Sequence, residues 1–381
     1  MKVAIFTDWF VYYSVELANV LSKEGCDILF VYKDHNLEIG SNITKKQFLD
    51  RSLNKHIKRI ETGFIPTLKN KKVIHNFLYI YREIKQFAPD ILHFQETEDP
   101  RYLLLSFLFP RNRIVYTVHD VYPHPGDVYS RIRLLVSTLF RKRVKYYICH
   151  GEKLKRELSS YVGDKKKIFS LPHGILNVFK MFSSDEIPQL NFFKEDKVFI
   201  LLFGRIHKYK GLDYLIKAEK LLSKKCNNYK IIIAGRGSDL DDRKLKYLKT
   251  NKNFVVLNRF IRNEEVGVLF KNSDIVVLPY IEASQSGVIP LAYQFGKSVV
   301  ATHVGSLPEV VDNGKTGFLV KPGDEYSLAE ALATLIKDEK LRKEMEVNAK
   351  NKAENELSWE NIARLTKKIY YQIIYSYENE K

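Results

Sequence analysis

A short loop between residues 204 and 211 holds two cations at a spacing that suits phosphate binding, Arg205 and Lys210. An arginine can donate two hydrogen bonds to one phosphate, and a lysine adds a compact positive charge. The loop follows the apolar run Val198–Phe203, which is typical of a buried strand, and a helical pattern begins at Leu212. Glycine lets the backbone approach an anion, and the start of a helix adds partial positive charge. The loop therefore predicts a binding site for a phosphorylated small molecule.

A second stretch, residues 278–311, is rich in glycine, proline and small polar residues. Its turn Ser284–Val288 offers hydroxyl and amide groups, and backbone amides at such a turn can bind a phosphate without a charged side chain. The stretch continues from Gly296 as Gly-Lys-Ser-Val-Val-Ala-Thr and from Val304 as Val-Gly-Ser-Leu-Pro-Glu-Val-Val.

Together these stretches resemble glycosyltransferase family 4, a group of retaining sugar transferases with the GT-B fold. In that family a Gly-Arg…Lys-Gly loop holds the donor diphosphate, so the resemblance implies this role for Arg205 and Lys210. The similarity is dense over residues 198–325 and thinner in the N-terminal half. It implies a nucleoside-diphosphate sugar as donor and no metal ion or other cofactor, because the two cations take the place of a metal.

The chain departs from the family at a pair of glutamates, Glu-x7-Glu, of which one faces the donor sugar and the other the ribose. The resemblance places them at Ala283 and Leu291, and neither is a carboxylate. Glu282 lies one position from the first, whereas nothing near Leu291 replaces the second. The donor-binding residues that we infer from the resemblance are Glu282, Gln285, Ser286, Gly287, Val288, Gly235, Arg236 and Ile261.

Polar and aromatic side chains in the N-terminal half follow predicted strands. His119 and Asp120 end the apolar run Ile114–Val118, where the family often has Thr-x-His-Asp with the histidine near the donor sugar and phosphate. The resemblance implies that role for His119, against the alternative of a histidine that only caps the strand. Asp120 suits either orienting the loop or touching a ligand. Trp9 and Tyr12 stand where the family commonly has a glycine pair, and they either stack on an acceptor sugar or pack in the core.

Short Val/Ile-rich runs alternate with amphipathic segments along both halves of the chain, which is typical of parallel sheets covered on both faces. The pattern predicts two Rossmann-like α/β domains, and the resemblance specifies the GT-B fold. We expect an acceptor-side domain over residues 1–175, joined by a C-terminal helix at about 362–381, and a donor domain over 176–361. The expected strands are 3–7, 27–32, 91–94, 114–118, 146–149, 168–171, 198–203, 230–234, 254–257, 275–278, 298–301 and 317–320.

The net charge of +17 is unevenly distributed: residues 1–175 hold 29 Lys and Arg against 18 Asp and Glu, and the remainder holds 33 against 27. The excess of positive charge is open to two interpretations. It is a solvated lysine-rich surface, or it is a surface that attracts anionic lipid headgroups. Nucleic acid binding is disfavoured because no recognition module is visible. The run Leu103–Phe109, flanked by Arg101 and Arg111, is also open to two interpretations, a membrane-contacting patch or a core helix.

No apolar run approaches the about 18 residues needed to span a bilayer, and the first predicted strand leaves no room for a signal peptide. The three cysteines have no metal-ligand spacing and suit a reducing compartment. We therefore expect a cytoplasmic protein, at most peripheral at the inner face of the membrane.

These features lead to the hypothesis of a retaining hexosyltransferase that moves a sugar from a nucleoside diphosphate to a glycan or lipid-linked acceptor in polysaccharide biosynthesis. Two alternatives stay open. One is a nucleotide-sugar epimerase of the same fold. The other is a catalytically silent nucleotide-sugar-binding partner subunit, which the lost glutamate pair makes plausible.

Overall fold

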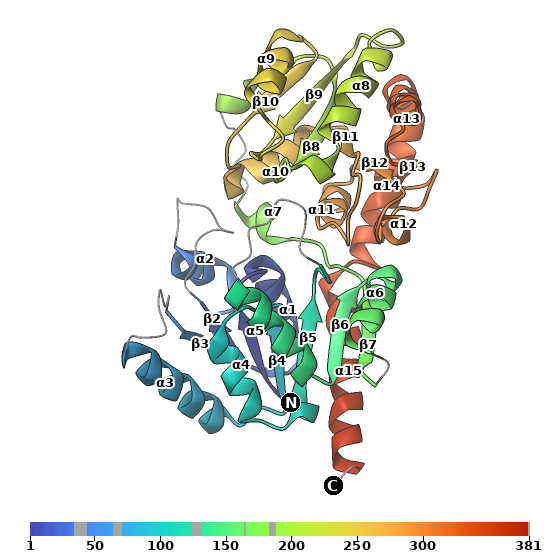
Figure 1. The fold of residues 1–381 in the computed structure, drawn as a ribbon. Coiled ribbons are helices and arrows are strands. Elements are labelled where there is room, and N and C mark those ends of the chain that lie inside the picture. Colours follow the sequence, from blue (N-terminus) through green and yellow to red (C-terminus); the bar gives the residue numbers. More distant parts are fainter. Residues whose placement is uncertain (34–43, 64–70, 123–130, 164, 183–187, 380–381) are drawn as a thin grey trace. The chain divides into compact units, whose positions relative to one another are not determined.

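The computed structural model describes residues 1–33, 44–63, 71–122, 131–163, 165–182 and 188–379 (Figure 1). These residues fall into two compact units. The first contains residues up to Val121, the described residues from 131 to 172 and the helix from Trp359; the second contains His173–Ser358. The expected boundaries at 175 and 361 lie a few residues further along the chain.

Seven parallel strands form the sheet of the first unit in the order β3-β2-β1-β4-β5-β6-β7. The strands β1, β4, β5 and β6 are almost wholly buried, as their continuous apolar sequences predict. The strands are β1 (Lys2–Thr7), β2 (Asp27–Tyr32), β3 (Lys58–Glu61), β4 (Ile91–Gln95), β5 (Ile114–Val118), β6 (Tyr146–His150) and β7 (Lys167–Leu171).

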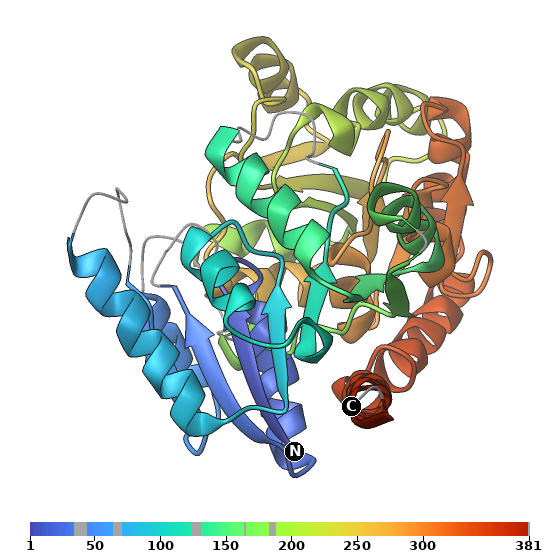
Figure 2. The same cartoon turned by 60° about the horizontal axis from the view of Figure 1, so that its bottom comes forward.

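Helices cover both faces of this sheet. The helices α3, α4, α5 and α6 pack on one face, in a single core cluster with alternate residues of the strands such as Leu92 and Phe94 (Figures 1 and 2). On the other face α1 packs against α15, and Tyr370 of α15 bonds to His93. The helices are α1 (Val11–Lys23), α2 (Lys45–Ser52), α3 (Lys71–Phe87), α4 (Pro100–Phe107), α5 (Arg131–Arg143), α6 (Glu152–Val162) and α15 (Trp359–Asn379), with a 3-10 turn η1 (Arg111–Arg113).

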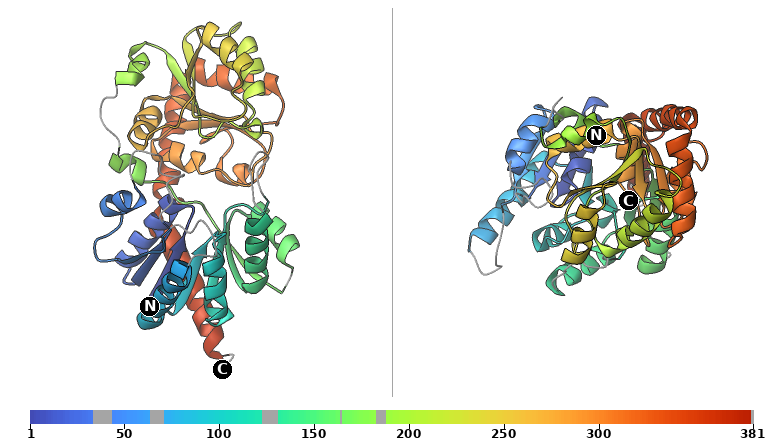
Figure 3. Two further views of the ribbon diagram at one scale, coloured as in Figure 1. Left: turned by 60° about the vertical axis from the view of Figure 1, so that its left-hand side comes forward. Right: turned by 90° about the horizontal axis from the view of Figure 1, so that it is seen from above.

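The second unit has six parallel strands in the order β10-β9-β8-β11-β12-β13 and helices on both faces (Figure 3). Its strands are β8 (Val198–Phe203), β9 (Tyr229–Ala234), β10 (Phe254–Leu257), β11 (Ile275–Leu278), β12 (Ser298–Thr302) and β13 (Gly317–Val320). Its helices are α7 (Val178–Phe182), α8 (Leu212–Leu222), α9 (Asp242–Thr250), α10 (Asn263–Asn272), α11 (Val288–Gln294), α12 (Leu307–Val310), α13 (Glu325–Lys337) and α14 (Glu339–Glu354), with 3-10 turns η2 (Pro188–Lys194) and η3 (Lys208–Lys210).

The structure confirms the predicted fold class of two parallel-sheet, Rossmann-like domains. All twelve expected strands are present within a residue or two, and one strand was missed, β3. Its sequence is Lys-Arg-Ile-Glu, and only Ile60 of it is buried. An edge strand with polar side chains on its exposed face has no continuous apolar run to identify it.

Candidate functional site

The turns after β8 and β9 meet at the carboxyl edge of the second sheet. Gly204 and Gly235 end these neighbouring strands with φ of 113° and 142°. A Cβ on Gly235 would lie 1.8 Å from the carbonyl oxygen of Gly204, so only glycine allows the two turns to touch. The backbone N–H of Ile206 donates to the carbonyl of Arg236 at 3.0 Å, which ties the turns together.

Lys210 leaves the same turn, and its ammonium is held beside an aromatic ring. Only 8 % of Lys210 is exposed; its Nζ donates to Tyr280 Oη at 2.5 Å and lies 3.9 Å from the ring centroid. Tyr280 follows β11, the strand next to β8 in the sheet. Gly211 allows this approach, because its φ is 73° and a Cβ there would meet the Pro279 carbonyl oxygen at 1.8 Å. The positive charge is therefore fixed at the strand ends.

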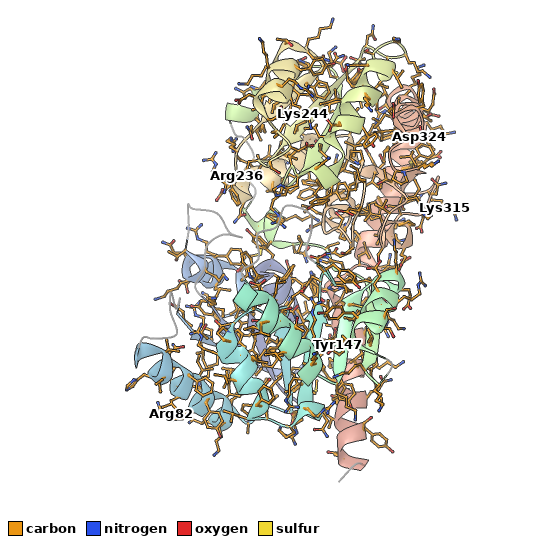
Figure 4. All side chains as sticks on the ribbon, viewed as in Figure 1. Arg82, Tyr147, Arg236, Lys244, Lys315 and Asp324 are labelled. Carbon is orange, nitrogen blue, oxygen red and sulfur yellow. The ribbon has the colours of Figure 1, made fainter. Side chains whose placement is uncertain are left out.

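Arg205 is exposed on this turn, directly after Gly204. Arg236 is exposed on the turn after β9 (Figure 4). The long, exposed side chains of Arg205 and Arg236 and the fixed ammonium of Lys210 thus lie at the carboxyl ends of adjacent strands. Such an edge is where open α/β sheets bind their ligands, and the charge is of the sign that a diphosphate needs.

The turn before α11 supplies polar atoms to the same edge. Ser286 Oγ accepts from the backbone N–H of Val288 at 3.3 Å and lies 3.5 Å from Tyr280 Oη. Gln285 Oε1 is shielded from solvent and has no hydrogen-bond partner among the described residues. A shielded acceptor without a donor is costly, and this oxygen is able to accept a hydrogen bond from a ligand.

Gly287 precedes α11 and lies beside His173, whose Cε1 would be 3.5 Å from a Cβ at that position. Burial lowers the pKa of His173 to about 4, so its ring is neutral near pH 7. Glu282, one position before the place that the resemblance gives to the first family glutamate, is exposed. Leu291, at the position of the second, is 2 % exposed and packs inside α11. At the position where the resemblance places the family's second glutamate, this chain has a core residue.

Ile261 is buried on the loop before α10. Glu265 fixes this loop, because it accepts from Arg259 at 2.6 Å on each oxygen and from the backbone N–H of Arg262 at 2.9 Å. Burial raises the pKa of Glu265, but these hydrogen bonds outweigh it and lower the pKa to about 2. The loop is therefore held by a charged bridge.

In the first unit, His119 is fully buried at the end of β5. Its ring stacks on Phe10 with centroids 3.6 Å apart, and its Nε2 lies 3.1 Å from Gln95 Oε1. The His150 ring, at the end of β6, is 5.0 Å away. Phe10 adopts a left-handed conformation with φ of 60°, which is uncommon for a bulky residue and orients its ring onto the histidine. His119 is therefore rigidly positioned.

Glu96, which was not predicted, holds the backbone of this loop. Its Oε2 accepts from the N–H groups of His119 (2.9 Å) and Asp120 (3.1 Å), and its Oε1 accepts from Arg141 at 2.5 Å. Burial raises the pKa of Glu96, although the Arg141 charge opposes that effect. The backbone carbonyl of Asp120 accepts a hydrogen bond from Arg141 at 2.9 Å.

Asp8, at the end of β1, is a second residue that was not predicted. Its Oδ2 accepts from Thr97 Oγ1 at 2.7 Å, and its carbonyl accepts from Lys45 Nζ at 2.9 Å. Burial, and then the charge of Asp99, raise the pKa of Asp8 to about 6. Next to it, Trp9 is partly exposed.

Tyr12 is 9 % exposed and packs edge-on against Phe48, with ring centroids 5.2 Å apart. Its surroundings match the core-packing interpretation. The acids Asp8 and Glu96 could have been found by one signal, since each lies within two residues of the end of a predicted apolar strand. Their partners Lys45 and Arg141 lie tens of residues away and carry no such signal.

Two family models match consecutive parts of the chain. The model described as Glycosyltransferase Family 4 matches residues 11–175, and the model described as Glycosyl transferases group 1 matches residues 183–352. Between them they include the exits of β5 and β8.

Relatives of known name are similar over part of their length. The chain is 28% identical over 228 residues to the capsular polysaccharide biosynthesis glycosyltransferase CapM of Staphylococcus aureus, covering 56% of this chain and 59% of that protein. It is 30% identical over 223 residues to the D-inositol 3-phosphate glycosyltransferase of Paenarthrobacter aurescens, covering 57% and 54%. The chain spans about half the length of the curated relatives it matches.

Solved structures share the fold along the whole chain. Sucrose-phosphate synthase from Thermosynechococcus elongatus aligns with a TM-score of 0.71 and 17% identity, covering 99% of this chain and 100% of that one. Anabaena Alr3699/HepE in complex with UDP and glucose aligns with a TM-score of 0.72 and 17% identity, covering 98% and 100%. At this identity the likeness concerns the fold.

Proposed function

Because this chain belongs to glycosyltransferase family 4 and has the GT-B fold, we propose that it moves a hexose-type sugar from a nucleoside diphosphate to a glycan or lipid-linked acceptor, with retention of the anomeric configuration. Two similar proteins support this choice of substrates. Alr3699/HepE is described in complex with UDP-glucose, and CapM as an enzyme of capsular polysaccharide biosynthesis.

One observation carries the donor assignment: Lys210 is a buried cation fixed on Tyr280 at the exit of β8. Withdrawing an ammonium from water costs free energy, and a nearby anion offsets that cost. An immobile ammonium loses little further entropy when a diphosphate binds, so the site is preorganised for that ligand.

The proposed chemistry needs a stabilised leaving group. In it, Lys210 and Arg205 neutralise the charge that develops on the departing diphosphate, in the role that a metal ion has in other transferases. The departing phosphate accepts the proton of the attacking acceptor hydroxyl. For His119, which is held rigid by Phe10 and Gln95, we propose the role that the family resemblance implies, toward the donor sugar and its phosphate. Gln285 Oε1 accepts from a donor hydroxyl.

A thermal-shift screen followed by a transfer assay tests this proposal. UDP-, GDP-, ADP- and dTDP-sugars are compared, because a bound donor raises the melting temperature according to its affinity. We expect one nucleotide class to stabilise the protein and the matching donor to be consumed only with an acceptor present. No shift with any of the four classes would contradict the proposal.

Leu291 favours a second candidate, the catalytically silent nucleotide-sugar binder, because a buried leucine stands where the family has a ribose carboxylate. Stabilisation by a donor without its consumption, across an acceptor panel, would support it. Epimerisation is distinguished by incubation with donor alone, which would then release sugar products without an acceptor.

The proposed location is the cytoplasmic face of the membrane, where a lipid-linked acceptor is presented. Among the described residues, no helix combines the length and the apolar character needed to cross a bilayer.

A further inference from the structure

The helices α3, α4 and α5 carry an unusual set of solvent-facing apolar residues. Eleven Leu, Ile, Val, Met and Phe side chains are exposed among the described residues, and eight of them lie on or directly after these three helices. The remaining three are scattered over the second unit. We name the eight residues the apolar helix face: Ile74, Leu78, Leu104, Phe107, Leu108, Leu134, Leu135 and Leu139.

The sequence run Leu103–Phe109, for which a core helix and a membrane-contacting patch were both left open, is divided between the core and the surface. Leu103 and Leu105 are buried in the core, whereas Leu104 is 56 % and Phe107 59 % exposed. A helix made only for the core would bear polar residues on its outer side. Isolated exposed apolar residues are ordinary, but a group confined to one layer marks an interaction surface.

The three helices form one continuous layer. Arg101 of α4 donates to Asn76 of α3 at 2.7 Å. Arg143 at the end of α5 lies over the ring of Phe107 at 5.3 Å and donates to the Ser106 carbonyl at 3.1 Å. The layer lies on one face of the first sheet (Figure 2).

Cations border this layer at the carboxyl ends of its helices. Arg111 follows α4, and Lys142 and Arg143 end α5. Lys166 joins them, because its Nζ donates to the Lys142 carbonyl at 2.8 Å. Arg82 of α3 is exposed near the end of that helix (Figure 4). Like charges are thus gathered beside apolar residues.

These cations are not compensated locally. Burial, and then the charge of Arg111, lower the pKa of both Arg143 and Lys166. In the part of the chain that the structure describes, no carboxylate lies within ion-pair distance of Arg111, Lys142, Arg143 or Lys166. Between Arg101 and Lys167 the sequence holds 15 Lys and Arg against five Asp and Glu. The arrangement is complementary to an anionic surface.

We propose that the apolar helix face and its bordering cations bind a bilayer that contains anionic lipid. Apolar side chains enter the boundary between headgroups and acyl chains, while the cations at the helix ends meet the lipid phosphates. Nucleic acid would need bases to stack on exposed aromatic rings, and aliphatic side chains dominate this face. Membrane binding would hold the enzyme where a lipid-linked acceptor lies, and this purpose rests on the proposed function. The binding itself is measured in an assay that involves no sugar transfer.

The opposite face of the first sheet offers a rival surface. A groove of about 540 Å³ beside α15 is lined by Arg364, Lys367, Lys368, Tyr371 and Tyr375, together with Glu24 and Gln372. Two tyrosines of this groove are exposed. Lys367 bonds to the Glu24 carbonyl, so part of its charge is already engaged. This surface lacks the aliphatic component and serves as an internal comparison.

Vesicle flotation tests the proposal. The full-length protein is mixed with vesicles of phosphatidylcholine alone or of phosphatidylcholine with phosphatidylglycerol. We expect binding to the anionic vesicles only, weakened by salt. Two variants of the face are compared, Leu104→Ser/Phe107→Ser/Leu108→Ser and Arg111→Glu/Lys142→Glu, and each should bind about tenfold or more weakly. All five side chains are exposed or half-exposed at the surface, so the fold tolerates the changes.

Matched controls alter the same chemistry elsewhere. Met181→Ser/Val347→Ser removes exposed apolar residues from the second unit, and Lys315→Glu/Lys340→Glu reverses exposed charges there. Both should bind vesicles as the wild type does. Lys368→Glu/Tyr371→Ser tests the α15 groove and should also bind normally. Failure of the wild type to float with anionic vesicles, unchanged binding by both face variants, or a loss confined to the α15 variant would overturn the proposal.

The outcome is separable from that of the proposed function. All variants are also measured for melting temperature with and without UDP and GDP. Vesicle binding lost with the nucleotide response intact supports the membrane role alone, and nucleotide binding absent in every form argues against the transferase while leaving the flotation result to stand.

Discussion

The two units share a strand order and differ in how they place charge. In the second unit, Arg205, Lys210 and Arg236 occupy glycine turns directly after strands, each within a few residues of the glycine that shapes it. In the first unit, the carboxylate of Glu96 pairs with Arg141, which lies 45 residues further along the chain. Local motifs can be read in a sequence because one stretch holds both the geometry and the chemistry. Networks whose members come together only in the folded chain cannot be read in this way.

The strongest effect is expected at Arg101, a buried cation of the first unit. It is 2 % exposed, pairs with Asp99 through two bonds at 2.9 and 2.6 Å, and donates to Asn76 and the Gly63 carbonyl. Removing one partner leaves an uncompensated buried charge, so Arg101→Met should destabilise the first unit by about 3–5 kcal/mol. Chemical denaturation followed by circular dichroism measures the change in the free energy of unfolding.

The exposed Arg111→Met is the control for that experiment and should change stability by less than about 0.5 kcal/mol. Equal effects of the two substitutions would show that the buried network is not what stabilises this unit.

The glycine turns of the second unit offer the corresponding test. Gly235→Ala must place a Cβ 1.8 Å from the Gly204 carbonyl oxygen, whereas Gly314→Ala has the same positive sign of φ, 79°, and open space around it. We expect a loss of about 1–2 kcal/mol at Gly314 from backbone strain alone and at least about 3 kcal/mol at Gly235, where the clash adds to it. Melting temperatures and nucleotide response are measured together. A Gly235→Ala protein as stable as Gly314→Ala would refute the contact between the turns.

Two carboxylates sharpen the comparison through opposite pH dependences. The pKa of Glu265 in the second unit is lowered to about 2, so its contribution to stability is present above its ordinary pKa and is lost as the pH falls toward 2. Glu265→Gln should therefore cost about 2 kcal/mol at pH 7, roughly half of that at pH 3 and little at pH 2.

Asp8 in the first unit behaves in the other direction. Its pKa is raised to about 6, so the folded state binds the proton more tightly and loses stability as the pH rises from about 4 through 6. Asp8→Asn should gain up to about 2 kcal/mol over the wild type at pH 8 and nothing at pH 4. Unfolding curves across this pH range check both signs, and parallel pH profiles for the two variants would contradict the assignments.

Most of the fold could be predicted from the sequence, because twelve strands are recognisable as apolar runs. The strand β3 was not predicted, because Ile60 is its only buried residue. The donor turns could be located from Gly204 and Gly211, whose positive φ values make glycine obligatory. The partner of Lys210 could not be predicted. Tyr280 lies beside Lys210 because β8 and β11 are neighbours in the sheet. The split of α4 into buried and exposed leucines likewise depends on which way the helix faces.

Titration calorimetry with UDP, GDP, ADP and dTDP tests the central claim, that the fixed ammonium of Lys210 binds a nucleoside diphosphate. Lys210→Ala removes this buried cation, and Lys208→Ala removes an exposed one from the same turn. We predict that one nucleotide binds the wild type and Lys208→Ala with similar affinity and binds Lys210→Ala about 10- to 100-fold more weakly, as expected for a lost charge-assisted hydrogen bond. Equal affinity of Lys210→Ala and the wild type, or no binding of any of the four nucleotides to the wild type, would contradict the account.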